Sequence, residues 1–430
     1  MEKIETSFYT PLTPEEKAMD IVRKWSLKEK KGDKNAREWA TLKIKDFLVE
    51  TADGTYTLKS QKMNESIETM HTTHGALREA REKFAQPAEL MGKKKVAILD
   101  ICSGLGINAS AALEQIINPL LNGELEHLEM DMVEISWEVL AATLIIPSPS
   151  GSIHSESHQV IKKAIEKYLI NKGLLSFSGE EKEIPANADI RVHCEDARKI
   201  VMEIPKNQVY DAVFLDPFSP TKSPELYSRE FLAKVRSLLK EDGVILTYTS
   251  AAPVRYALLN AGLEIGEGPA LGRSGGTIAS PSLHRITKPL SSADERMIAL
   301  SDAGIPYRDP ELNLSANEII ENRHLERIAA RGNSKIASTV KTPVYLANDL
   351  DERTLADERI KRRVLKHLES FSIDDMNSLK SRFLVCPQFS NCICCCGQDG
   401  PSTSRARIKQ MEKRLKIVAD GNFKMINGID

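Results

Sequence analysis

Short apolar runs alternate along the chain with longer amphipathic stretches, which is the pattern of a sheet covered by helices. Residues 212–215 are apolar without alternation, as expected of a strand buried on both faces of a parallel sheet. Five strands are predicted: residues 96–101, 127–135, 188–194, 212–215 and 243–250. Helical patterns follow the first and the fifth strand, at residues 109–117 and 254–259, and residues 263–265 and 277–279 could add a closing antiparallel pair. This order predicts an α/β fold with an open, doubly wound sheet.

Helical additions precede and follow the predicted sheet. A capping box at Thr13 and Glu16 starts a helix over residues 15–25, and a second helix is predicted at about residues 34–50. A turn at residues 53–54 then indicates a small hairpin. We therefore predict an N-terminal helical cap with a hairpin, a sheet core, and a helical C-terminal region with a Cys-rich segment: residues 1–85, 86–288 and 289–430.

Four of the predicted strands end in a carboxylate. The acids are Asp100, Glu134, Asp196 and Asp216, in chain order. Each one alone is typical of a solvated strand end. Because the carboxyl ends of parallel strands meet at one edge of a sheet, where doubly wound folds bind ligands, four together favour a ligand site.

A glycine turn follows the first strand and precedes a helix. Gly104 and Gly106 allow a sharp turn against which a ligand can lie, with the helix N-terminus behind it. The turn departs from the dinucleotide fingerprint, because Ala109 stands three residues after Gly106 and Asp100 precedes the loop. An acid at this point would repel a pyrophosphate but suits the ammonium group of S-adenosyl-L-methionine, which is the predicted cofactor.

The other acids fit the same cofactor. Glu134 could accept hydrogen bonds from two ribose hydroxyls, and Asp196 stands where an adenine amino group would arrive. The predicted cofactor contacts are Asp100, Ser103, Gly104, Gly106, Asn108, Glu134, Asp196 and Ala197. Together with the strand order, they indicate a class I, Rossmann-like methyltransferase sheet.

A proline-rich loop follows the fourth strand. Its prolines at positions 217, 220 and 224 fix φ repeatedly and hold Asp216, Phe218 and Lys222 in a stiff loop. Asp216 is the carboxylate best placed to accept or orient the proton of an attacking amine, so it is the predicted catalytic residue. Its alternative role is to cap the turn. Phe218 and Lys222 are predicted substrate contacts.

The segment FLDPFSPTKSPELY, at residues 214–227, is the most specific part of a family resemblance that covers about residues 50–285. With GVILTYTSA at residues 243–251, it resembles the methyltransferase domain of MnmC-type tRNA wobble-uridine modification enzymes. The segment DGTYTL at residues 53–58, followed by Glu65 and His71, is similar to the stand-alone members that lack a flavin oxidase domain. No Gly-x-Gly-x-x-Gly turn follows residue 290, so no such oxidase domain is expected.

The resemblance implies transfer of a methyl group from S-adenosyl-L-methionine to the amine of 5-aminomethyl-uridine in the tRNA anticodon. It implies that Glu65, His71 and Arg273 contact the substrate, and that partner enzymes make the aminomethyl precursor. Cys102 and Ser103 stand where bacterial members have more glycine, which is a departure within the cofactor loop.

Two other functions fit parts of the pattern. A small-molecule amine methyl- or aminopropyltransferase of the polyamine-synthase type would share the sheet. Those enzymes usually place a second acid three residues after the fourth-strand aspartate, and Ser219 occupies that position here. A metal-dependent RNA-binding protein with an inactive core is the third interpretation, and the intact strand-end acids count against it.

The composition of the 430 residues agrees with a cytoplasmic enzyme, since no apolar run reaches membrane-spanning length and the chain does not start with a signal peptide. Because the formal charge is only −2, contact with tRNA requires local basic patches. Arg323, Arg327 and Arg331 recur on one helical face and are either a solvated face or a phosphate-contacting stripe. Further basic residues cluster at positions 361–366 and 405–416.

Five of the seven cysteines fall within eleven residues, from Cys386 to Cys396. In a cytosolic chain such a density of thiols favours metal binding over disulfides. The predicted ligands are Cys386, Cys392, Cys394 and either Cys395 or Cys396, and zinc is favoured over an iron–sulfur cluster. We expect the tail to depend on the metal for its order, because a segment this short and polar has little core of its own.

Overall fold

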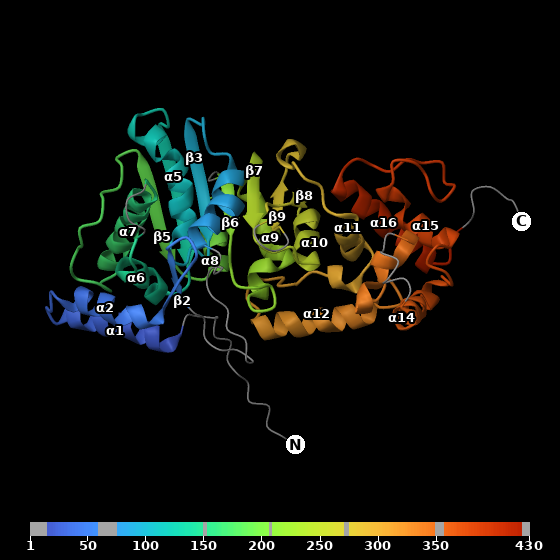
Figure 1. Cartoon of the computed structure of the whole chain (residues 1–430), viewed down its shortest axis with the longest axis horizontal. Coiled ribbons are helices and arrows are strands. Elements are labelled where there is room, and N and C mark those ends of the chain that lie inside the picture. Colours follow the sequence, from blue (N-terminus) through green and yellow to red (C-terminus); the bar gives the residue numbers. More distant parts are fainter. Residues whose placement is uncertain are drawn as a thin grey trace, which may run out of the picture. The chain divides into compact units, whose positions relative to one another are not determined.

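The fold is built on a seven-stranded sheet in the order β5-β4-β3-β6-β7-β9-β8 (Figure 1). The computed structural model describes residues 15–58, 75–148, 153–205, 209–270, 275–348 and 357–423. The strands are β3 (Lys95–Ile101), β4 (His127–Glu134), β5 (Ala188–Cys194), β6 (Tyr210–Leu215), β7 (Leu239–Thr247), β8 (Glu264–Glu267) and β9 (Thr277–Ser280). The fifth strand begins earlier than the sequence predicts, at Leu239, and ends at Thr247.

Parallel pairing around β3 sets the position of the site. β3 pairs with β4 on one side and with β6 on the other, both in parallel, so the strand order reverses between β3 and β6. Ile101 lies opposite both Val133 and Leu215, which aligns the carboxyl ends of the three strands. The residues of β6 are all buried, as the unbroken apolar run requires. The predicted class I methyltransferase fold, with helical additions, is confirmed.

Helices connect these strands (Figure 1). They are α5 (Ile107–Leu121), α6 (Trp137–Ile145), α7 (Ile153–Asn171), α8 (Ala197–Glu203), α9 (Arg229–Ser237) and α10 (Ala252–Asn260). The sequence between the second and third predicted strands indicates an amphipathic helix followed by a polar loop. That insertion is α7 with the irregular segment after it, and α7 packs on α5 and α6.

The N-terminal elements differ in detail from the prediction. α1 (Glu16–Lys30) begins after Glu15, which makes no side-chain cap hydrogen bond, and Thr13 of the predicted capping box lies outside the described residues. The second helix, α2 (Ala36–Ile44), is shorter than predicted because the chain tightens into a 3₁₀ turn and then enters the hairpin of β1 (Leu48–Glu50) and β2 (Tyr56–Leu58). The helical segments α3 (Ala76–Ala80) and α4 (Gln86–Ala88) flank a π turn at Arg81–Ala85.

The chain forms two compact units. The first comprises Met1–Leu226, Lys234–Thr249 and Gly268–Ile278, and the second comprises Tyr227–Ala233, Ser250–Glu267 and Ala279–Asp430. Helices in the last part of the second unit are α11 (Ser292–Ala299), α12 (Ala316–Ala330), α14 (Glu358–Leu368), α15 (Leu379–Val385) and α16 (Ser404–Ala419). Among the described residues, no helix combines the length and the apolar character that crossing a membrane requires. The three-part division at residues 85 and 288 stays a prediction.

Candidate active site

The glycine loop between β3 and α5 has a left-handed backbone at alternate residues. Cys102, Gly104 and Gly106 have φ values of 62°, 52° and 70°. A Cβ atom on Gly106 would lie 2.8 Å from Cγ2 of Ile161 on α7. Glycine is therefore needed at position 106 both for the backbone conformation and for the close approach of α7.

Glu134, the last residue of β4, holds this loop in place. One carboxylate oxygen accepts a hydrogen bond from the backbone N–H of Gly104 at 3.1 Å, and the other accepts one from Ser136 at 3.1 Å. The backbone N–H of Ser103 adds a bond to the carbonyl of Val133 at 3.0 Å. Burial raises the pKa of Glu134, although the backbone donors oppose the rise.

Asp100 is a buried carboxyl with unused hydrogen-bonding capacity. It is 0 % exposed, and neither of its oxygens forms a hydrogen bond with a described residue; the same holds for Oγ of buried Ser103. Burial and the neighbouring Glu134 raise the pKa of Asp100 to about 7, while the backbone N–H of Ala109 opposes the rise without reaching hydrogen-bond geometry. Buried polar atoms normally have partners, so orphans at a glycine loop fit the binding of a polar, cationic ligand there.

Asp216 stands directly after β6 and is linked to the glycine loop. Nδ2 of Asn108, in the first turn of α5, donates to the Asp216 carboxylate at 2.8 Å. Burial raises the pKa of Asp216 well above its usual range, and negative charge on Glu79 and Asp100 adds to the rise. The strand order reverses between β3 and β6, so Asp100 and Asp216 lie on the two sides of the point where doubly wound sheets bind ligands.

Glu79 and Lys83 are residues that the sequence did not single out for this site. They form a buried ion pair of 2.8 Å in the α3 and π-turn segment. The charge of Glu79 acts on Asp216 from 137 positions away in the chain. No periodicity or spacing in the chain indicates that proximity.

Asp196 and Ala197 begin α8 beyond the end of β5. Asp196 caps the helix by accepting from the backbone N–H of Arg198 at 2.9 Å, and it pairs with the guanidinium of the same residue at 2.7 Å. Ala197 is buried. Capping and ion pairing occupy part of the Asp196 carboxylate, so its contact with an adenine amino group stays a prediction.

The predicted substrate residues fall into two groups. Phe218 and Lys222 are half-buried in the loop after Asp216, where the backbone N–H of Lys222 donates to the carbonyl of Ser219 at 2.7 Å. The other three, Glu65, His71 and Arg273, lie outside the described residues.

Helix α7 contacts the glycine loop. Its buried His158 approaches the carbonyl of Leu105 at 3.4 Å and Oγ of Ser148 at 3.0 Å. Burial lowers the pKa of His158 well below its usual range, so the ring is neutral at physiological pH. A small, mainly apolar pocket adjoins it, lined by residues that include Tyr56, Leu105 and Thr143. The sequence interpretation of this insertion as a helix gave no role to the histidine.

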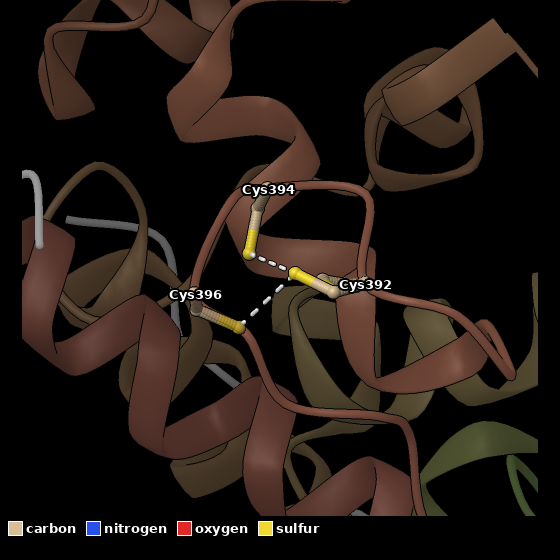
Figure 2. Close-up of side chains that lie close together, drawn as sticks. Cys392, Cys394 and Cys396 are labelled. Atoms are coloured by element: carbon tan, nitrogen blue, oxygen red, sulfur yellow. Dashed lines mark hydrogen bonds between the residues drawn. The ribbon is translucent and has the colours of Figure 1, made fainter. Parts of the chain in front are cut away.

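Four of the C-terminal cysteines form a cluster within the second unit. Sγ atoms of Cys386, Cys392, Cys394 and Cys396 all lie within 4.8 Å of one another, whereas Cys395 is exposed. Figure 2 shows three of them, with dashed lines that join the Cys392 sulfur to those of Cys394 and Cys396.

The arginine stripe on α12 is bound to its own unit. Arg327 and Arg331 donate to the buried Asp302 carboxylate at 3.0 and 2.9 Å. Arg323 donates to two backbone carbonyls and lies over the Tyr307 ring at 4.6 Å. Both sequence interpretations, a solvated face and a phosphate-contacting stripe, miss these packing roles.

Residues 155–281 match the family described as S-adenosyl-L-methionine-dependent methyltransferase. An uncharacterized protein of Methanocaldococcus jannaschii is 36% identical over 320 residues, which cover 74% of this chain and 83% of that protein. The solved structure of MnmC2 from Aquifex aeolicus is 27% identical with a TM-score of 0.52, covering 71% of this chain and 96% of that one.

Bifunctional MnmC proteins match over shorter stretches. The tRNA 5-methylaminomethyl-2-thiouridine biosynthesis protein MnmC of Azoarcus sp. is 33% identical over 95 residues, which are 22% of this chain and 15% of that protein. The matching protein of Ralstonia nicotianae is 24% identical over 208 residues, 47% of this chain and 30% of its own length. The chain thus spans less than a third of these two relatives. With the sheet order, the glycine loop and these matches, the chain belongs to the S-adenosyl-L-methionine-dependent methyltransferase family that includes the methyltransferase domain of MnmC.

Proposed function

We propose that this protein methylates the exocyclic amine of a 5-aminomethyl-type uridine at the wobble position of tRNA. The observation that carries the proposal is the Asp216 carboxyl, joined to the cofactor loop through Asn108 at 2.8 Å. The names of the MnmC relatives support an RNA substrate of this kind. It follows that the protein would work in the cytoplasm on tRNA, after partner enzymes have made the aminomethyl group.

The residues of the loop fit S-adenosyl-L-methionine, which would supply the methyl group. Asp100, with its two unpartnered oxygens, would bind the ammonium group of the cofactor. Glu134 already accepts a hydrogen bond from the backbone of Gly104, and its remaining lone pairs would accept hydrogen bonds from the ribose hydroxyls. This reaction scheme assigns no step to zinc.

Asp216 would act on the amine. An amine is nucleophilic only without its extra proton, and a carboxylate whose pKa is raised toward the working pH accepts that proton more readily. Asn108 orients one carboxylate oxygen of Asp216. Most of the acceleration would come from holding amine and methyl donor in line.

A basic surface on α14 is the part of the chain that we propose for tRNA phosphates. Its exposed residues are Arg359, Lys361, Arg362, Arg363 and Lys366, and we call them the α14 basic surface. Val364 and Leu368 of the same helix are buried. Exposed cations on a firmly packed helix suit contact with a phosphate backbone.

The decisive experiment combines methyl transfer with nucleoside analysis. The full chain is incubated with methyl-labelled cofactor and with tRNA that carries, or lacks, the 5-aminomethyl group, and the digested nucleosides are examined by mass spectrometry. Label in the methylaminomethyl nucleoside of the first tRNA alone is the expected result. Equal labelling of both tRNAs, or labelling only of a free polyamine in a parallel reaction, would overturn the proposal in favour of another substrate.

A further inference from the structure

The four clustered cysteines have the spacing of a tetrahedral metal site. The Cys392 sulfur lies 3.9 Å from that of Cys386, 4.0 Å from that of Cys394 and 3.6 Å from that of Cys396. A zinc ion with four Zn–S bonds of about 2.3 Å puts its sulfur atoms about 3.8 Å apart. The observed distances lie on both sides of this value.

Other thiol chemistry fits this spacing less well. A disulfide needs sulfurs at about 2 Å, and these four are all free. In a four-iron cluster each cysteine binds a different iron, and in a two-iron cluster each iron binds two cysteines. Both arrangements hold the four sulfur atoms farther apart than a single ion does. All four sulfurs within 4.8 Å of one another therefore indicate one mononuclear ion.

The local backbone is shaped to point these sulfurs inward. Cys386 follows directly after α15, and its sulfur accepts from the backbone N–H of Ile393 at 3.4 Å. Cys395 has a left-handed backbone, with φ of 60°, although it carries a side chain. Such a conformation costs on the order of 1 kcal/mol, and it leaves Cys395 exposed while its two neighbours join the cluster. Strain of this kind persists where surrounding contacts hold it.

Arg414 on α16 supplies positive charge to the cluster. Its guanidinium donates to the sulfurs of Cys394 and Cys396, both at 3.4 Å, and to the carbonyl of Phe383 at 2.8 Å. The group also lies over the Phe383 ring at 4.6 Å. Four thiolates around a divalent ion have a net charge of −2, so a buried arginine that donates to two of them offsets half of that charge.

We propose that Cys386, Cys392, Cys394 and Cys396 bind one structural zinc ion, and that Arg414 is its positioning residue. All four coordination positions are filled by the chain, which is typical of structural rather than catalytic zinc. The site joins the end of α15 and the loop after it to α16. The proposal does not depend on the substrate of the methyltransferase.

Metal content of the full chain tests the site. Purified under anaerobic conditions, the protein is expected to contain one equivalent of zinc by elemental analysis. Cys392→Ser and Cys394→Ser should each lower zinc occupancy at least tenfold in the presence of a competing chelator. Cys395→Ser is the matched control and should keep the zinc, because its thiol faces solvent. Iron in place of zinc, no metal in the wild type, or equal zinc loss in Cys395→Ser would overturn the assignment.

A second measurement covers the case in which a cysteine variant does not fold. Cobalt substituted into the wild-type protein should give the intense absorption of tetrahedral four-thiolate coordination, and weak octahedral bands would contradict the site. Arg414→Gln should lower zinc affinity by about 10- to 100-fold, the usual effect of removing a group that hydrogen-bonds a ligand. Arg414→Lys should restore part of it, whereas unchanged affinity in Arg414→Gln would remove Arg414 from the site.

Discussion

Among single residues, Asp100 is well placed to bind the cofactor but lowers the stability of the folded chain when it ionises. Its folded pKa of about 7 lies above the ordinary value of about 3.9, so its burial stabilises nothing once it ionises. The sign is that of a raised carboxyl pKa: the contribution of Asp100 to the free energy of unfolding is largest below about pH 4 and is lost as the pH rises through about 7. A cationic ligand beside Asp100 would counteract this loss of stability, because it favours the ionised form of the carboxyl group.

We therefore expect Asp100→Asn to have opposite effects on stability and on binding. At pH 8 the variant without cofactor should be more stable than wild type, by up to a few kcal/mol, since no buried charge forms. Cofactor affinity, measured by calorimetry between pH 6 and 8, should rise with pH in the wild type and change less in the variant. Parallel pH profiles for the two proteins would show that Asp100 does not face the cofactor.

Asp216 is expected to matter for turnover and not for cofactor binding. Asp216→Asn keeps the shape of the side chain and the contact with Asn108 but removes its basicity, so methyl transfer should fall by about 10²- to 10⁴-fold. Single-turnover rates and calorimetry on the same preparation measure the two properties separately. The exposed Asp242→Asn is a matched control and should behave as wild type. A fully active Asp216→Asn variant would leave this aspartate with only a turn-capping role.

Among the helices, α12 and α14 both carry rows of basic residues but use them differently. Arg327 and Arg331 on α12 are bound to Asp302, whereas the α14 basic surface is exposed. Replacing Arg359 and Arg363 with Gln should weaken tRNA binding and reduce the slope of log affinity against log salt by about 1 to 2. The melting temperature of this double variant should stay close to that of the wild type.

The matched pair on α12, Arg327→Gln with Arg331→Gln, should have the reverse outcome. It leaves the buried Asp302 carboxylate without its two cations, which should lower the free energy of unfolding by about 3 kcal/mol. The salt slope of tRNA binding should not change. If both double variants lose tRNA affinity equally, the α14 basic surface is not the site of phosphate contact.

The elements of the sheet could be predicted from the sequence, since apolar runs such as that of β6 are long and bounded by turn residues. Their boundaries were less accurate where the pattern is polar, as near the start of β7, where residues 240–242 are half-buried or exposed. The second helix was predicted too long because its periodicity continues into residues that the 3₁₀ turn and β1 occupy. The ends of these strands and helices depend on tertiary contacts, which a local sequence pattern does not contain.

In the whole molecule, the C-terminal segment contributes to the core of its unit. Ile408, Met411 and Leu415 of α16 are buried, and Arg407 pairs with the buried Glu295 of α11 at 2.6 Å. These buried side chains contradict the premise that the tail is too polar to bury a core, while the dependence of its order on a metal stays a prediction. Of the basic residues at positions 405–416, Arg405, Arg407 and Arg414 make internal contacts, and Lys409, Lys413 and Lys416 are exposed.

Deletion of residues 380–430 should consequently unfold the second unit. The loss of three large buried side chains, at about 2 to 5 kcal/mol each, is comparable to the whole stability of a typical domain. We expect rapid proteolysis of residues 279–379 in the deleted protein. An unchanged melting temperature and protease resistance would mean that α16 is not required for this unit.

The candidate site could be predicted only in part. Family membership and the fold followed from motifs whose geometry is local, such as the glycine turn with its left-handed Gly104 and Gly106. The sequence could not indicate that Asn108 donates to Asp216, because the two residues are 108 positions apart and meet only through the pairing of β3 with β6. Nor could it place Ile161 and His158 of the insertion against the glycine loop.

The hydrogen bond between Asn108 and Asp216 has a kinetic consequence. Asn108 lies in the first turn of α5, directly after the glycine loop, so a cofactor bound at that loop would help to fix the donor that orients the aspartate. An ordered mechanism is then expected, in which the methyl donor enters first and the demethylated product leaves last. Inhibition by that product would be competitive against the donor and noncompetitive against the nucleic acid, a pattern that Asn108→Ala should convert to random addition.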